Sequence, residues 1–107
     1  MRWYKHLYVG ERAGKKRFSM IQNIRKNRFQ PGVHVITPAS NEKNLLDIYP
    51  AAVLLQSYYK NNEDLLILGI GADYFETLLV ARDIVDDIYR QTGGFSLGEF
   101  LKKNGQR

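Results

Sequence analysis

The chain has 107 residues, of which 44% are hydrophobic and 25% charged, and this fits one folded domain, residues 1–107, rather than a disordered segment. It has no cysteine, which excludes disulfides, cysteine nucleophiles and thiolate metal sites and agrees with a reducing, cytoplasmic compartment. The net charge is +5, but residues 1–31 hold nine Lys and Arg against one acid, giving +8, whereas residues 32–107 carry −3.

No stretch of the chain has the pattern of a membrane or export segment. The first residues lack the apolar region of a secretion signal. The longest apolar run, residues 65–72, is far short of the roughly 20 residues that cross a bilayer. We therefore expect a cytoplasmic protein that does not contact a membrane.

The N-terminal part predicts a strand followed by a helix. Residues 4–9 alternate along the chain with aromatic and β-branched side chains, as a strand does. Residues 10–14 form a loop. Residues 15–29 are predicted to be helical, with an apolar stripe of Phe18, Ile21, Ile24 and Phe29.

The middle of the chain predicts a second strand and an interrupted helix. Residues 30–32, Gln-Pro-Gly, are typical of a turn, and residues 33–37 of a strand. Residues 42–60 are predicted to be helical with a break at Pro50, which suits the first turn of a new helix.

An alternative makes residues 53–59 a strand that forms a hairpin with residues 65–68. Good helix formers between residues 51 and 56 favour the helix.

The last part predicts a buried strand and two helices. Residues 65–70 are apolar without alternation, so this strand should be central and covered on both faces. Residues 73–92 form a helix that Gly93 ends, and residues 95–103 form a short helix capped by Ser96. The apolar stripe predicted for the longer helix is Tyr74, Leu78, Ala81, Val85, Ile88 and Tyr89.

The elements follow the order β-α-β-α-β-α-α. Strands joined through helices are usually parallel neighbours. We therefore expect a small three-layer α/β domain with about three mainly parallel strands.

The pair Gly69-x-Gly71, between the third strand and its helix, is the clearest motif. It resembles the start of a dinucleotide fingerprint, but Tyr74 stands where the third glycine belongs. A tight connection to the helix explains the glycines more simply. If a pocket exists, it lies at the strand carboxyl ends, where backbone amides near Ala72 could hold an anion. The candidate ligand-binding residues are Thr37, Ser40, Gly69, Gly71 and Asp73.

Cations gather in the first loop and helix. They could neutralise nucleic-acid phosphates, and Trp3, Tyr4 and Tyr8 could stack on bases. No base-reading motif accompanies them. The alternatives are a solvated helix face, or one that meets the protein's own acidic helix in a dimer. The candidate nucleic-acid or anion-binding residues are Arg12, Lys15, Lys16, Arg17, Arg25 and Lys26, followed by Arg28.

No catalytic or metal site is predicted, and no cofactor is expected. Asp83, Asp86 and Asp87 share a helix face, which is more typical of a solvated surface than of a magnesium site. His6 and His34 lie in predicted strands, and their rings could approach each other if those strands are adjacent.

Three segments, residues 4–10 (YKHLYVG), 30–37 (QPGVHVIT) and 65–71 (LLILGIG), resemble small conserved hypothetical proteins of Gram-positive bacteria. This resemblance implies no particular activity.

Three hypotheses remain. The first is a non-enzymatic binding or adaptor protein that uses the basic helix or an apolar helix face. The second is a small ligand-binding or enzymatic domain with a pocket near Gly71, and the third is a non-specific nucleic-acid binder. The small size and many large apolar residues, such as Tyr58, Tyr59, Phe95 and Phe100, also predict a homodimer or a protein partner.

Overall fold

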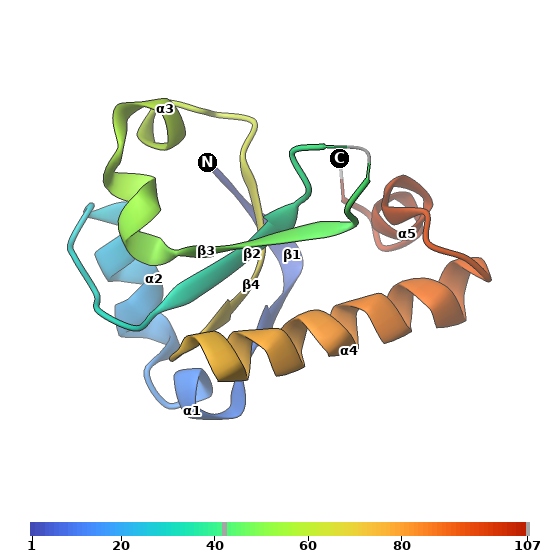
Figure 1. Cartoon of the computed structure of the whole chain (residues 1–107), viewed down its shortest axis with the longest axis horizontal. Coiled ribbons are helices and arrows are strands. Elements are labelled where there is room, and N and C mark those ends of the chain that lie inside the picture. The colour runs from blue at the N-terminus through green and yellow to red at the C-terminus, as the bar shows by residue number, and fades with distance from the viewer. Residues whose placement is uncertain (42, 107) are drawn as a thin grey trace.

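The computed structural model describes residues 1–41 and 43–106 and has a four-stranded mixed sheet. The strand order is β1 (Arg2–Val9), β4 (Leu66–Gly71), β2 (His34–Pro38) and β3 (Leu46–Pro50) (Figure 1). β1 and β4 are parallel, whereas β2 is antiparallel to both β4 and β3. The expected sheet of about three mainly parallel strands is therefore wrong.

The error arises from β3, which lies within residues predicted as helix. Leu46 and Ile48 pack toward one core and Tyr49 toward the other, so the segment has the alternation of a strand. It forms an antiparallel hairpin with β2. The chain therefore enters β4 in the direction opposite to β2, and β2 and β4 pair antiparallel instead of parallel. Pro50 ends the strand at the sheet edge, where proline is tolerated.

The rest of the predicted 42–60 helix is two short turns, η1 (Ala51–Leu55) and α3 (Ser57–Lys60). The alternative strand at residues 53–59 is therefore wrong as well. Residue 42, where the predicted helix begins, lies outside the described residues.

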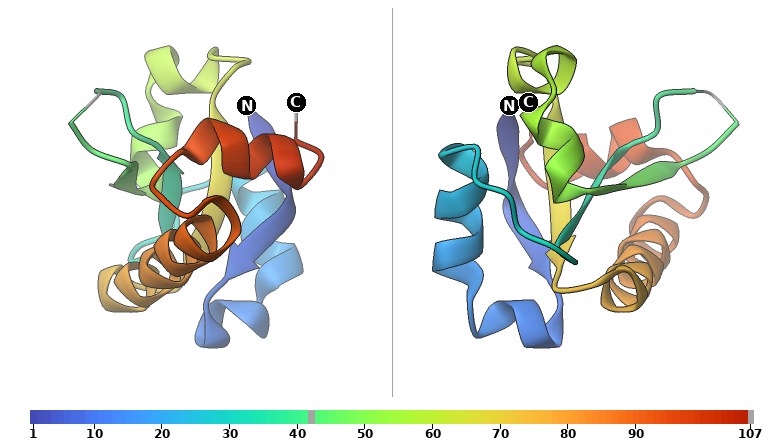
Figure 2. Two further views of the ribbon diagram at one scale, coloured as in Figure 1. Left: turned by 90° about the vertical axis from the view of Figure 1, so that its right-hand side faces the viewer. Right: turned by 60° about the vertical axis from the view of Figure 1, so that its left-hand side comes forward.

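Helices cover both faces of the sheet (Figure 2). On one face lie α1 (Glu11–Gly14), α2 (Arg17–Arg25) and η1. The predicted loop over residues 10–14 is therefore wrong, since it contains α1, and the helix predicted over residues 15–29 is the shorter α2. On the other lie α4 (Tyr74–Thr92) and α5 (Leu97–Lys103). Two of the caps are as predicted: the Ser96 hydroxyl accepts from Glu99 N–H at 3.2 Å, and Gly93, with a φ of 74°, ends α4. Asp73, which the sequence placed in the first turn of the helix, is instead its N-cap and accepts from Glu76 N–H at 2.8 Å.

β4 divides the interior into two cores. It is buried along its whole length, and Leu68 and Ile70 are at most 1% exposed, which confirms the predicted central strand. Ile67 and Ile70 pack with α1 and α2, whereas Leu66 and Leu68 pack with α4 and α5.

Two predicted apolar stripes are only partly right, since Ile21 and Ile24 of the first and Ala81 and Ile88 of the second pack in the cores. α2 buries Met20 and Ile24, while Phe18 and Phe29 are 77% and 65% exposed. α4 buries Thr77, Val80, Ile84 and Ile88, so Ile88 is the one residue of its predicted stripe that is buried.

Candidate functional site

The carboxyl ends of β1 and β4 lie side by side, and the chain leaves them toward opposite faces. Gly10 N–H donates to the Ile70 carbonyl at 3.0 Å. From there β1 continues into α1 on one face and β4 into α4 on the other. Ligands of open α/β sheets commonly bind at such a divergence.

Here the glycines serve packing instead. A Cβ at Gly71 would lie 2.8 Å from the Thr77 backbone nitrogen, and one at Gly10 would lie 2.4 Å from side-chain carbons of Glu76. Gly71 ends β4 and its φ is not positive. Glycine is therefore required there because a side chain has no room, and not because of the backbone conformation. The close approach lets the first turn of α4 rest against both strand ends.

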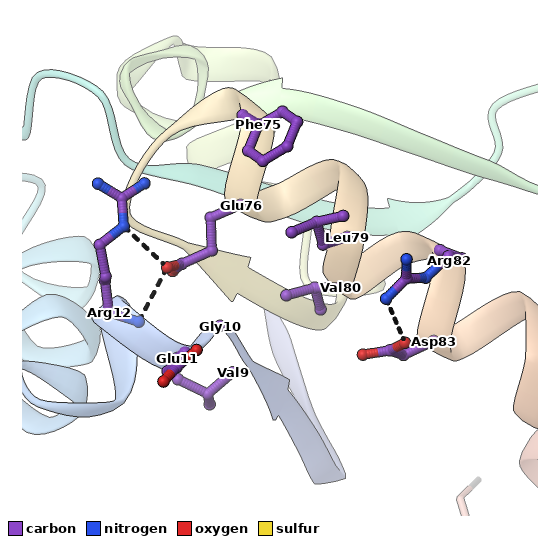
Figure 3. Close-up of a pocket in the computed structure, with 10 residues that line it drawn as sticks. All are labelled: Val9, Gly10, Glu11, Arg12, Phe75, Glu76, Leu79, Val80, Arg82 and Asp83. Carbon is purple, nitrogen blue, oxygen red and sulfur yellow. Dashed lines mark hydrogen bonds and ion pairs between the residues drawn. The ribbon is translucent and has the colours of Figure 1, made fainter.

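The anion predicted at the Ala72 amide is supplied by the chain itself. The carboxylate of Glu76, a residue only 6% exposed, accepts N–H groups from Ala72 at 2.9 Å, Arg12 at 2.8 Å and Ala13 at 3.1 Å. The Arg12 guanidinium lies 3.3 Å from the same carboxylate and also pairs with Asp73. The N-terminus of α1 is therefore closed by an internal acid (Figure 3).

The hydrogen bonds keep this acid ionised. Burial alone raises the pKa of Glu76, but the backbone donors of Ala72, Arg12 and Ala13 outweigh it, and the pKa lies below its usual range. The pKa of Asp73 is also lowered, first by the Glu76 N–H and then by Arg12. Glu76 thus acts as a structural anion and is not poised as a general base.

A shallow cleft of about 550 Å³ runs beside this cluster, between β1 and α4. Its apolar wall is Val9, Phe75, Leu79 and Val80 (Figure 3). Of the charged residues that border it, Arg12 and Glu76 already pair with each other, and Arg82 pairs with Asp83. From the sequence, Arg12 is a candidate anion-binding cation and Glu76 is an acid in the first turn of its helix, where it suits the helix dipole. Neither position predicts that the two side chains pair.

The predicted ligand-binding residues do not form one pocket. Because β2 is antiparallel to β4, Thr37 and Ser40 lie at the opposite end of the sheet from Gly71 and Asp73. They border a separate hollow of about 340 Å³. There the Asp47 carboxylate accepts from Ser40 N–H and from the Tyr49 hydroxyl, both at 2.9 Å.

Gly69, the remaining candidate, lies within β4. A Cβ there would press on Ile36 and Val80, each 3.2 Å away.

The two histidines lie on strands that are not neighbours, and two of the three clustered acids form ion pairs. β4 separates β1 from β2, so His6 and His34 are not on neighbouring strands. Asp83 pairs with Arg82 at 3.5 Å, and Asp87 with Arg90 at 2.9 Å. Within residues 1–41 and 43–106, no three His, Asp or Glu side chains are placed to hold a metal ion.

Six other cations of the first third lie in α2 or in the segments that flank it, and all six are exposed. We call Lys15, Lys16, Arg17, Arg25, Lys26 and Arg28, with the exposed rings of Phe18 and Phe29, the basic face. Arg12 is excluded because it pairs with Asp73 and Glu76. None of the six cations makes an ion pair with any residue that the structure describes.

Two hollows flank α2 on this face. One, of about 570 Å³, is lined by Arg12, Lys15 and Lys16 and by three neutral polar residues, Ser19, Asn23 and Gln30. The other, of about 460 Å³, contains Trp3, Arg25 and Lys60, with the Arg25 guanidinium 5.8 Å from the Trp3 ring centre. No acid is among the described residues lining either hollow.

No family model, curated protein or solved structure matches the chain. No helix of the described residues is long and apolar enough to cross a membrane.

Proposed function

We propose that the protein is a non-enzymatic binding protein whose basic face holds single-stranded nucleic acid. The observation that carries this proposal is the pair of hollows beside α2, both lined by cations and neither by an acid among the described residues. A row of exposed cations attracts polyanions, and a phosphate backbone supplies anions in a row.

The rings on this face favour a nucleic acid over a bare polyanion. Phe18 and Phe29 stand among the cations with most of their surface exposed, and Trp3 lies beneath Arg25. Bases stack on such rings with little regard to sequence, and this adds affinity that a duplex cannot use because its bases are already stacked. Binding should therefore favour single strands and show little sequence preference.

Fluorescence anisotropy with a short labelled single-stranded RNA tests the proposal. We expect binding at about 10 µM protein in about 50 mM salt, because non-specific complexes have dissociation constants near 10⁻⁴ to 10⁻⁶ M even at higher, physiological salt. The triple variant Lys15→Gln, Lys16→Gln, Arg17→Gln should bind much more weakly. A matched triple variant, Lys5→Gln, Lys43→Gln, Lys102→Gln, removes the same charge from exposed positions elsewhere and should bind nearly as wild type.

Two results would overturn the proposal. One is the absence of any RNA or DNA binding under these conditions. The other is binding to vesicles of anionic lipid without binding to RNA, which would assign the exposed phenylalanines to a membrane surface.

A further inference from the structure

The outer side of α4 carries a second stripe, opposite the one that packs on the sheet. Phe75, Leu79, Arg82, Asp86 and Tyr89 follow one another at alternate spacings of four and three residues. This is the 3.5-residue repeat of a helix that packs lengthwise against another helix. We call these five residues the α4 seam, and Figure 3 shows Phe75, Leu79 and Arg82 along it.

The apolar part of the seam is open to solvent. Phe75 is 67% exposed, Leu79 38% and Tyr89 56%. Phe95, 63% exposed, extends the surface beyond the helix end, its ring centre 5.7 Å from that of Tyr89. Exposed aromatic residues gathered on one surface are typical of an interface centre.

The order of charges along the seam favours a second copy of α4, in antiparallel orientation, as the partner. Arg82 and Asp86 stand in its middle, with apolar residues on either side. Suppose that two copies of α4 run antiparallel and that the twofold axis crosses the seam level with residue 84. Arg82 of each copy then lies beside Asp86 of the other. A parallel pair would instead place like charges opposite each other, which disfavours it.

The ends of the seam also match in this arrangement. Leu79 of one copy meets Tyr89 of the other. Phe75 reaches Gly93, where a Cβ would have no atom within 4 Å, so a large ring has space there next to Phe95. An isologous dimer requires a surface that is complementary to a second copy of itself turned by 180°. The α4 seam meets this requirement in both its charges and its apolar groups.

We infer that the protein forms a homodimer through antiparallel pairing of the α4 seams. The seam lies on the face of the molecule opposite the basic face, so both basic faces stay accessible in the dimer. The inference does not depend on nucleic-acid binding.

Sedimentation over a range of concentrations gives the first test. Wild type should approach twice 12.4 kDa at about 100 µM. Leu79→Glu should be monomeric.

Arg82→Glu or Asp86→Arg alone should weaken association at least about tenfold, because each places like charges together. A 1:1 mixture of these two variants, and the double variant, should recover it. Lys102→Glu, an exposed charge reversal on α5, is the control.

Cysteine cross-linking tests the direction of the helices in a chain without natural cysteines. A mixture of Leu79→Cys and Tyr89→Cys should oxidise to a disulfide-linked dimer. Leu79→Cys alone should not, because in the antiparallel pair its two copies are about 15 Å apart along the helix, beyond the roughly 7 Å that a disulfide spans. A wild-type monomer at 100 µM, failure of the charge-swapped mixture to associate, or self-linking of Leu79→Cys would each overturn the inference.

Discussion

Glu76 is the residue whose chemistry matters most to the fold. Its carboxylate is bound by three backbone N–H groups and is nearly excluded from water. Glu76→Gln leaves at least one of these donors without a good acceptor and should cost about 1–3 kcal/mol of unfolding free energy at pH 7. Glu99→Gln, at a half-exposed carboxylate, should cost little. Urea unfolding measures both.

The same carboxylate gives the stability a defined dependence on acid. Because the folded-state pKa of Glu76 is lowered, its contribution is fully present above the unfolded value near 4.3 and is lost as pH falls through the folded pKa. The unfolding free energy of wild type should therefore fall between pH 5 and pH 3 by more than that of Glu76→Gln. Equal losses in the two proteins would show that other groups carry the acid dependence.

Gly71 tests why the Gly-x-Gly pair is present. Gly71→Ala should destabilise the protein, because the added carbon meets the Thr77 backbone and α4 must move. Gly98→Ala, within α5 and with no neighbour within 4 Å, should be neutral or stabilising by about 0.4–1 kcal/mol. Thermal unfolding compares the two. If Gly71→Ala is as stable as wild type, the close packing at this turn is wrong.

Among the elements, α4 shows how far periodicity predicts structure. Its span and the glycine that ends it follow from the sequence, but its N-cap and its buried side do not. The helix has apolar residues on both its inner side and the α4 seam, so the spacing fits more than one orientation. In the structure Thr77 packs closely against Gly71, and this contact lies outside the periodic pattern.

This orientation is testable by matched truncations. Ile84→Ala should cost about 2–5 kcal/mol, because Ile84 is fully buried. Leu78→Ala, in the stripe that the sequence predicted, should cost far less, because Leu78 is 42% exposed. Chemical unfolding at low protein concentration, where the monomer dominates, gives both values. The reverse order would restore the predicted orientation.

β3 shows the second limit. Its alternation spans only five residues, next to Pro50 and residues of high helix propensity, so local signals favoured a helix. β3 is stabilised by its pairing with β2, whose residues lie outside the local segment that was read as a helix. The predicted pocket failed for the same reason. Thr37 and Gly71 share an edge only in a parallel sheet, and one hairpin is enough to place them at opposite ends.

At the scale of the molecule, the charge asymmetry seen in the sequence becomes a spatial one. The basic face lies on α2, whereas Asp83, Asp86 and Asp87 lie on α4 across the sheet. The grouping of cations was predictable because most come from one short segment. Two features were not predictable because they depend on tertiary contacts: the lack of ion pairs between these cations and the other described residues, and the pairing of Arg12 with Glu76 and Asp73.

The salt dependence of binding separates this local face from the net charge of +5. Each phosphate neutralised on a single strand contributes about 0.7 to the slope of log affinity against log salt concentration. Replacing Lys15, Lys16 and Arg17 by Gln should therefore reduce the slope by about 2, whereas the matched variant of Lys5, Lys43 and Lys102 should leave it nearly unchanged. Phe18→Ala with Phe29→Ala should weaken binding without altering the slope, since stacking releases no counterions. If the two triple variants reduce the salt slope equally, any exposed cation of this protein contributes to binding and the basic face has no special role.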